Sequence, residues 1–181
     1  MRSVLVGACV LLFFCGRPAL AGEIVYSSRG FHIAGGSGIA VAPFQNLTEA
    51  GGAGENFAND VAESLSRAGV FRIIGTAQFK SRLPYANIGK AAFTDRSIAQ
   101  VMGRQLGVNY VVFGSVVEYG YELADDGSRT IPIAGVDVRI VDVYSGAIVF
   151  AGSFVKEGSP GAPLYDVAMD AADAVRERVV R

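Results

Sequence analysis

The stretch LGVNYVVFGSVVEYGYEL, residues 106–123, decides the fold of this chain. From Val108 to Glu122 it is rich in Val and Tyr, residues that favour a pleated and half-buried strand. A second run of this kind covers 136–144, and a third covers 148–155. Ser145-Gly146 between them is typical of a two-residue hairpin turn, because Gly accepts a positive φ. These runs predict three consecutive strands.

The segment that follows the third strand has helical periodicity. Charged side chains from Asp170 to Arg178 fall on its opposite face. An apolar stripe of this width predicts a helix from Pro163 to Val180 that packs against the sheet. The stripe consists of Leu164, Val167, Ala168, Ala171, Ala174, Val175 and Val179.

Upstream of residue 106, helical and strand patterns alternate. Phe57, Val61 and Leu65 share one helical face, and Gly69 is a typical residue to follow a helix end. A second helix carries apolar side chains from Ile98 to Leu106, with Thr94 or Asp95 as its cap. Short apolar runs at 39–44 and 70–74 predict strands. We expect a short helical turn at 76–83 and loops at 45–54 and 84–92.

The predicted elements therefore run strand, helix, strand, short helix, helix, three strands, helix. This order favours one α/β domain of the α+β kind, residues 39–181, with a mixed sheet flanked by helices. Residues 22–38 have no sustained period and contain the cluster Gly35-Gly36-Ser37-Gly38, so we expect an arm or linker there.

Residues 1–21 have the pattern of a secretory signal peptide. Arg2 provides the positive start, Val4 to Phe14 an apolar run, and Ala19-Leu20-Ala21 a cleavage site. A membrane anchor is the alternative, but the run is about 11 residues long where a spanning helix needs roughly 20. We therefore expect a periplasmic protein.

Both cysteines of the chain, Cys9 and Cys15, fall in this leader. Either one is a candidate for the lipidated cysteine of a lipoprotein, although Phe14 directly before Cys15 is unusually bulky and Cys9 leaves a very short leader. Cleavage after Ala21 leaves a mature chain without cysteine, which excludes a disulfide. The sequence leaves lipidation open.

Composition excludes several classes of function. Apolar residues make up 51% of the 181 residues, as in a compact globule rather than a disordered chain. Removing Arg2 and Arg17 leaves 14 basic and 17 acidic residues, a net charge of −3 without a basic stripe, so nucleic acid is not an expected partner. With His32 as the only histidine, we expect no catalytic, metal or cofactor site.

Gly51-Gly52-Ala53-Gly54 stands where a phosphate-binding loop would precede a helix, but the pattern lacks its third glycine, since Phe57 takes that place. A surface loop is the simpler interpretation. Asp125 and Asp126 are interpretable as an acid–base pair or as ordinary turn residues, and the turn is favoured. We expect these two, with Arg129, at a hairpin tip that faces a partner or a lumen. Tyr119 and Tyr121 share one face of the strand leading to that tip and are further candidates for partner contact.

Three segments taken together resemble the CsgG/PelC family. They are IAVAPFQNLT at 39–48, LGVNYVVFGS at 106–115 and VRIVDVYSGAIV at 138–149. The family includes the curli secretion protein CsgG, the exopolysaccharide export lipoprotein PelC and, more distantly, the peptidoglycan-synthase activator LpoB.

The resemblance implies an anticodon-binding-domain-like, CsgG-like fold in a non-enzymatic accessory protein of the periplasm or outer membrane. Exopolysaccharide or curli-type secretion is then the expected process. The expected assembly is a ring of identical subunits beside an outer-membrane exporter or other envelope protein, and a secreted polymer is a further candidate partner. A regulator that binds a peptidoglycan synthase is the alternative. The connections 123–132 and 157–163 are too short for the pore-forming hairpins of CsgG, so we expect no contribution to a membrane barrel.

Overall fold

The computed structural model describes residues 23–83, 96–124 and 127–180. Its elements in chain order are β1 (Glu23–Ser27), β2 (Gly38–Val41), β3 (Gln45–Asn46), α1 (Ala53–Arg67), β4 (Arg72–Ile74), α2 (Thr76–Arg82), α3 (Arg96–Leu106), β5 (Tyr110–Leu123), β6 (Thr130–Asp142), β7 (Ile148–Glu157) and α4 (Leu164–Val179). The expected leader, residues 1–21, and the expected caps Thr94 and Asp95 lie outside the described residues. No described helix has the length and apolar character needed to cross a membrane.

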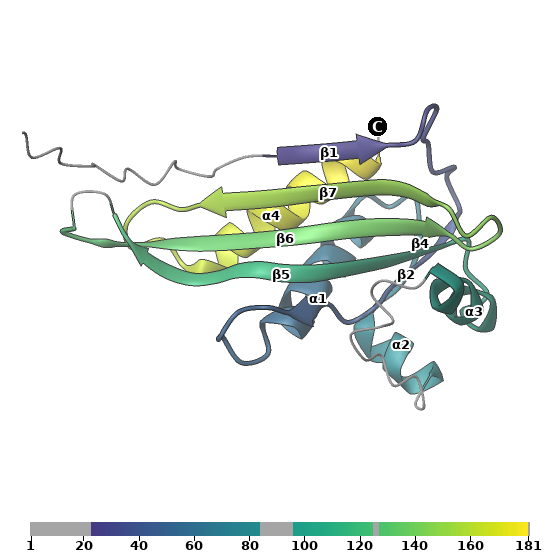
Figure 1. The fold of residues 1–181 in the computed structure, drawn as a ribbon, viewed down its shortest axis with the longest axis horizontal. Helices are drawn as coiled ribbons and strands as arrows, with labels where there is room; N and C mark the ends of the chain where they lie inside the picture. The colour runs from purple at the N-terminus through teal and green to yellow at the C-terminus, as the bar shows by residue number, and fades with distance from the viewer. Residues whose placement is uncertain (1–22, 84–95, 125–126, 181) are drawn as a thin grey trace, which may run out of the picture.

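All seven strands form one mixed sheet in the order β1-β7-β6-β5-β2-β4, with β3 paired to β5 (Figure 1). The strands β5, β6, β7 and β1 pair in antiparallel fashion, while β2 lies parallel to both β5 and β4. The predicted α/β fold with a mixed sheet flanked by helices is confirmed.

The two faces of the sheet are covered unequally. Helices α1 and α4 lie together on one face, where the larger hydrophobic cluster contains Phe57, Phe150 and Phe154. Helices α2 and α3 belong to a smaller cluster around Phe79 and Val111 at the end of the sheet away from the β5–β6 tip. The long antiparallel strands are therefore covered by helices mainly on the α1 and α4 side.

Two glycines allow helices to approach the sheet more closely than a side chain would permit. A Cβ on Gly54 would lie 2.3 Å from the Phe44 carbonyl oxygen, and one on Gly103 would lie 2.2 Å from a Val143 methyl carbon. Gly54 belongs to α1 itself, so the last glycine of the 51–54 cluster permits close packing between α1 and the segment after β2.

The sequence analysis did not predict β1, which lies within the expected arm. Its five residues are all exposed and therefore show no alternating pattern. Pairing with β7 places Glu23 opposite Phe154, and the Glu23 carboxylate accepts hydrogen bonds from Arg178 at 2.7 Å and Lys156 at 3.2 Å. The arm is thus tied to the sheet through its backbone and one ion-pair group.

Two further boundaries differ from the prediction. Strand β6 begins at Thr130 rather than residue 136, because its first residues pair with the far end of β5 up to Leu123. The predicted two-residue turn at Ser145-Gly146 is wrong, since residues 143–147 all lie between β6 and β7. The Asp142 carboxylate accepts hydrogen bonds from the Ser145 amide and hydroxyl, both at 2.7 Å, and thereby holds this longer turn.

Candidate functional site

The strand that carries Tyr119 and Tyr121 changes its alternation near its middle. The β5–β6 register shifts between Val116 and Glu118, which is the signature of a β-bulge. Beyond the shift, Tyr119 lies opposite Ala134 and Tyr121 opposite Pro132. Both tyrosines consequently lie on the α1 and α4 side of the sheet, on one face as the alternation predicted.

The two tyrosines differ in their surroundings. The Tyr119 ring meets the Phe57 ring edge-on, with centroids 6.3 Å apart, and is half-buried against α1. Burial raises the pKa of Tyr119, the charge of Asp60 raises it further, and a hydrogen bond with the Asn56 side chain opposes the shift. Tyr121 is 58% exposed and is therefore free to contact another molecule.

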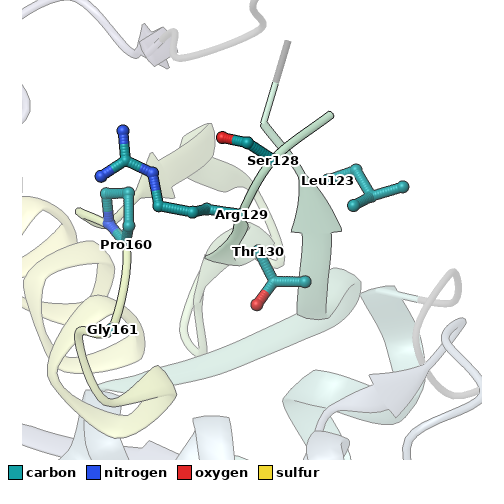
Figure 2. A pocket seen from close by; sticks show the side chains of 6 residues that line it. All are labelled: Leu123, Ser128, Arg129, Thr130, Pro160 and Gly161. Carbon is teal, nitrogen blue, oxygen red and sulfur yellow. The ribbon is translucent and has the colours of Figure 1, made fainter. Parts of the chain in front are cut away.

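Arg129 lies at the base of the tip, immediately before β6. Figure 2 shows its side chain reaching across to Pro160 in the β7–α4 connection. These residues, with Leu123, Thr130 and Gly161 among others, line a shallow hollow of about 540 Å³. No hydrogen bond or ion pair to another described residue holds the Arg129 guanidinium. Asp125 and Asp126, also expected at the tip, lie outside the described residues.

We use the name tip surface for Tyr121, Leu123, Arg129 and Pro160. Leu123 is 70% exposed, so an apolar side chain, an aromatic ring and a guanidinium with no partner among the described residues lie along one end of the molecule. Tyr, Arg and exposed apolar side chains are the groups from which protein interfaces draw most of their binding energy. The arrangement is suited to binding a partner, and Arg129 favours an anionic group such as a carboxylate.

A second hollow, of about 680 Å³, lies at the opposite end of the sheet beside the β6–β7 turn. Arg104, Asn109 and Tyr144 are among its lining residues, and Tyr144 is 95% exposed. Sequence reasoning did not select this end, although Asn109 and Tyr144 belong to two of the three segments that carry the family resemblance.

Sequence reasoning also missed Asp60 on α1. Only 8% of this residue is exposed, and burial together with the neighbouring Glu63 charge raises the pKa of its carboxyl to about 6. The sequence does carry a signal for this residue: Asp60 stands next to Val61, on the face of the predicted helix that turns to the core. An acidic side chain at such a position is rarely buried without a reason. Across the described residues, no group of three or more His, Cys, Asp or Glu side chains is placed to hold a metal ion.

The fold defines a class: a small α/β domain with a mixed sheet, of the CsgG, PelC and LpoB type. A family model described as "Peptidoglycan-synthase activator LpoB" matches residues 26–154, and the chain belongs to this family. No curated protein sequence matches the chain significantly.

Solved structures agree with the assignment. A variant of the PelC dodecamer from Paraburkholderia phytofirmans is 26% identical with a TM-score of 0.64, covering 88% of this chain and 99% of that one. Lipoprotein GNA1162 from Neisseria meningitidis is 19% identical with a TM-score of 0.59, over 78% and 97% of the two chains. E. coli LpoB is 18% identical with a TM-score of 0.52, over 70% and 60%. The resemblance expected from the sequence is confirmed.

Proposed function

We propose that this protein is a non-enzymatic accessory of the bacterial envelope that binds and activates a peptidoglycan synthase. The family match over residues 26–154 carries this proposal, because the family is described by that activity. It reverses the order expected from the sequence, in which export came first and synthase regulation was the alternative. The expected signal peptide supports a periplasmic location, which is the compartment that holds peptidoglycan.

In this proposal the tip surface is the contact with the synthase. Arg129 supplies a guanidinium for a carboxylate of the partner, and Tyr121 and Leu123 supply apolar area around it. Contacts of this composition match the usual interface core of aromatic, apolar and Arg side chains. Asp125 and Asp126 lie between Leu123 and Arg129 in the sequence, and their part in this contact stays a prediction.

The test is binding of the mature protein to the purified bifunctional synthases of the same bacterium, measured by biolayer interferometry alongside their rate of glycan polymerisation. We expect one synthase to bind and to polymerise faster. Arg129→Glu should weaken binding at least tenfold, about 1.4 kcal/mol, while the matched reversal Arg82→Glu on the distant α2 leaves binding unchanged. Absence of binding to every synthase would contradict the proposal.

A second candidate function is a ring-forming accessory of an outer-membrane exporter, for exopolysaccharide or curli-type cargo. The similarity to the PelC dodecamer over nearly the whole of that chain favours it. The strand β1 adds support, because it is an edge strand with Ile24 79% exposed and Tyr26 60% exposed, and such edges readily pair with another chain.

Native mass spectrometry distinguishes the two functions. A discrete closed oligomer that Tyr26→Lys dissociates would favour the ring, in which identical subunits associate head to tail. A monomer that binds a synthase would favour the regulator.

A further inference from the structure

Asp60 differs from the other buried polar residues of the described chain. The buried hydroxyl of Ser64 donates a hydrogen bond to Asp173, and that of Thr76 donates one to Asn59. Asp60 is buried too, at 8% exposure, yet none of the described residues forms a hydrogen bond or ion pair with its carboxylate. Its oxygens are not sealed from solvent, so another molecule can reach them. Burial removes part of the water around this carboxylate, so a cationic partner that donates hydrogen bonds to it would stabilise its ionised form.

The helix that carries Asp60, α1, packs against both β5 and α4. Glu63 lies one helical turn further along α1, on the same side of the helix. Tyr119 of β5 reaches α1 at Phe57, which is one turn before Asp60. Tyr165 stands in the first turn of α4 and is 54% exposed.

The charge of the Asp60 carboxylate acts on both rings. The pKa of Tyr119 is raised by burial and then by the Asp60 charge. The pKa of Tyr165 is raised by Glu63, by burial and also by Asp60, and lowered by Arg67. Helical spacing puts Glu63 beside Asp60, the Phe57 contact brings Tyr119 to α1, and α4, which carries Tyr165, packs on α1. We call this set, Asp60, Glu63, Tyr119 and Tyr165, the acidic–aromatic cluster.

The chain's own cations near the cluster are engaged elsewhere. The Arg67 guanidinium, one turn beyond Glu63, is 2.7 Å from the Asp173 carboxylate and also contacts the Met169 sulfur at 3.0 Å. Lys80 is 2.6 Å from Glu55 at the start of α1. Asp166 on α4 adds another negative charge. Among the described residues, no cation therefore forms an ion pair with Asp60 or Glu63.

We propose that the acidic–aromatic cluster is a docking site for an arginine side chain of the partner protein. A guanidinium has five N–H donors, binds carboxylates through paired hydrogen bonds and stacks on aromatic rings, which are the groups present here. The described residues contain no group of three or more His, Cys, Asp or Glu side chains placed to hold a metal ion, and the two aromatic rings of the cluster favour a guanidinium over a metal ion. The inference rests on the proposed function for the partner's identity, but not for the chemistry of the site.

The site has a defined pH dependence. Burial and then Glu63 raise the pKa of Asp60 to about 6, so the carboxylate is ionised at neutral pH and largely protonated at pH 5. The other charged and titratable groups that face it or its ring neighbours are Glu63 and Arg67 on α1, Tyr119 and Tyr121 on β5, and Tyr165 and Asp166 on α4. Arginine binding should weaken about tenfold between pH 7.5 and pH 5, because roughly a tenth of Asp60 stays ionised.

The experiment uses the peptide acetyl-Gly-Arg-Gly-amide as the probe, followed by amide NMR shifts of the mature protein. At pH 7.5 we expect saturable shifts near residues 60, 119 and 165, and none from the same peptide with citrulline in place of Arg. Asp60→Asn should weaken binding at least tenfold and Glu63→Gln severalfold, whereas Glu55→Gln, whose carboxylate already pairs with Lys80, should leave it unchanged. Glu63 is exposed, so its variant keeps the test valid if Asp60→Asn folds poorly.

Three results would overturn the site: no saturable shifts, equal shifts from the citrulline peptide, or full binding in both Asp60→Asn and Glu63→Gln. The same variants assayed against the synthases separate this inference from the proposed function. Synthase binding that both variants retain would refute the site and leave the function intact. Arginine binding in a protein that no synthase recognises would refute the function and leave the site intact.

Discussion

Replacing Asp60 by Asn should make the stability of the protein less sensitive to pH. In the folded protein, burial and the Glu63 charge raise the pKa of Asp60 from 3.8 to about 6. The folded state therefore binds this proton more tightly than the unfolded state does. Each whole number by which the pKa is raised corresponds to about 1.36 kcal/mol. The raised pKa of Asp60 therefore lowers the free energy of unfolding at neutral pH by about 3 kcal/mol.

The sign of the effect follows from proton binding. Asp60 in the wild type is protonated in both states below about pH 3, and there it costs almost nothing. As pH rises from about 3 to 6, the unfolded state loses the proton first and stability falls; well above pH 6 the full cost is present. Asn does not titrate, so the stability of Asp60→Asn relative to wild type should increase by about 2.5 kcal/mol between pH 4 and pH 7.5.

Urea unfolding at a series of pH values, followed by circular dichroism, measures this difference directly. The pH-dependent part should correspond to about 5–10 °C in melting temperature for a domain of this size. Glu55→Gln is the control, since Glu55 is half-exposed and paired with Lys80. A difference between Asp60→Asn and wild type that stays constant from pH 4 to 7.5 would refute the idea that Asp60 is buried as an unpaired acid.

Two further predictions concern the fold. Gly54→Ala should lower the free energy of unfolding by about 3 kcal/mol, because its Cβ would meet the Phe44 carbonyl oxygen. Gly51 has open space around it, so Gly51→Ala should change the free energy of unfolding little, and thermal melts of both variants measure the difference. Glu23→Gln should speed amide hydrogen exchange in β1 severalfold by weakening the bond to Arg178. The hydrogen bond from Arg178 holds the pKa of Glu23 below its usual value. Amide protection of β1 in the wild type should therefore persist at neutral pH and decline as acid protonates Glu23. Exchange in Glu23→Gln as slow as in the wild type would show that backbone pairing alone retains β1.

The elements with a strong period were predictable, and those without one were not. Helix α1 was visible in Phe57, Val61 and Leu65 because one side of it faces a core, and α4 for the same reason. Strand β1 was not visible, because both of its faces are exposed and only pairing with β7 makes it a strand. The start of β6 was missed since β5 decides how far the ladder extends, through pairs such as Leu123 with Thr130.

The candidate site shows the same division. The alternation of β5 placed Tyr119 and Tyr121 on one face, which the structure confirms, but exposure separates them: Tyr119 packs on Phe57 while Tyr121 remains free. The hollow beside Arg129 depends on Pro160, which is remote in sequence. That Asp125 and Asp126 belong to the site stays a prediction.

By itself, the sequence determined the class of fold, the family and the expected leader, because these follow from periodicity, turn chemistry and motifs written in consecutive residues. Only the tertiary structure decided that Asp60 is buried without a partner. Its burial depends on packing between α1, β5 and α4, and Arg67 on the same helix is held by Asp173, more than a hundred residues further along the chain. Such properties arise from distances between remote segments, and a one-dimensional pattern does not contain those distances.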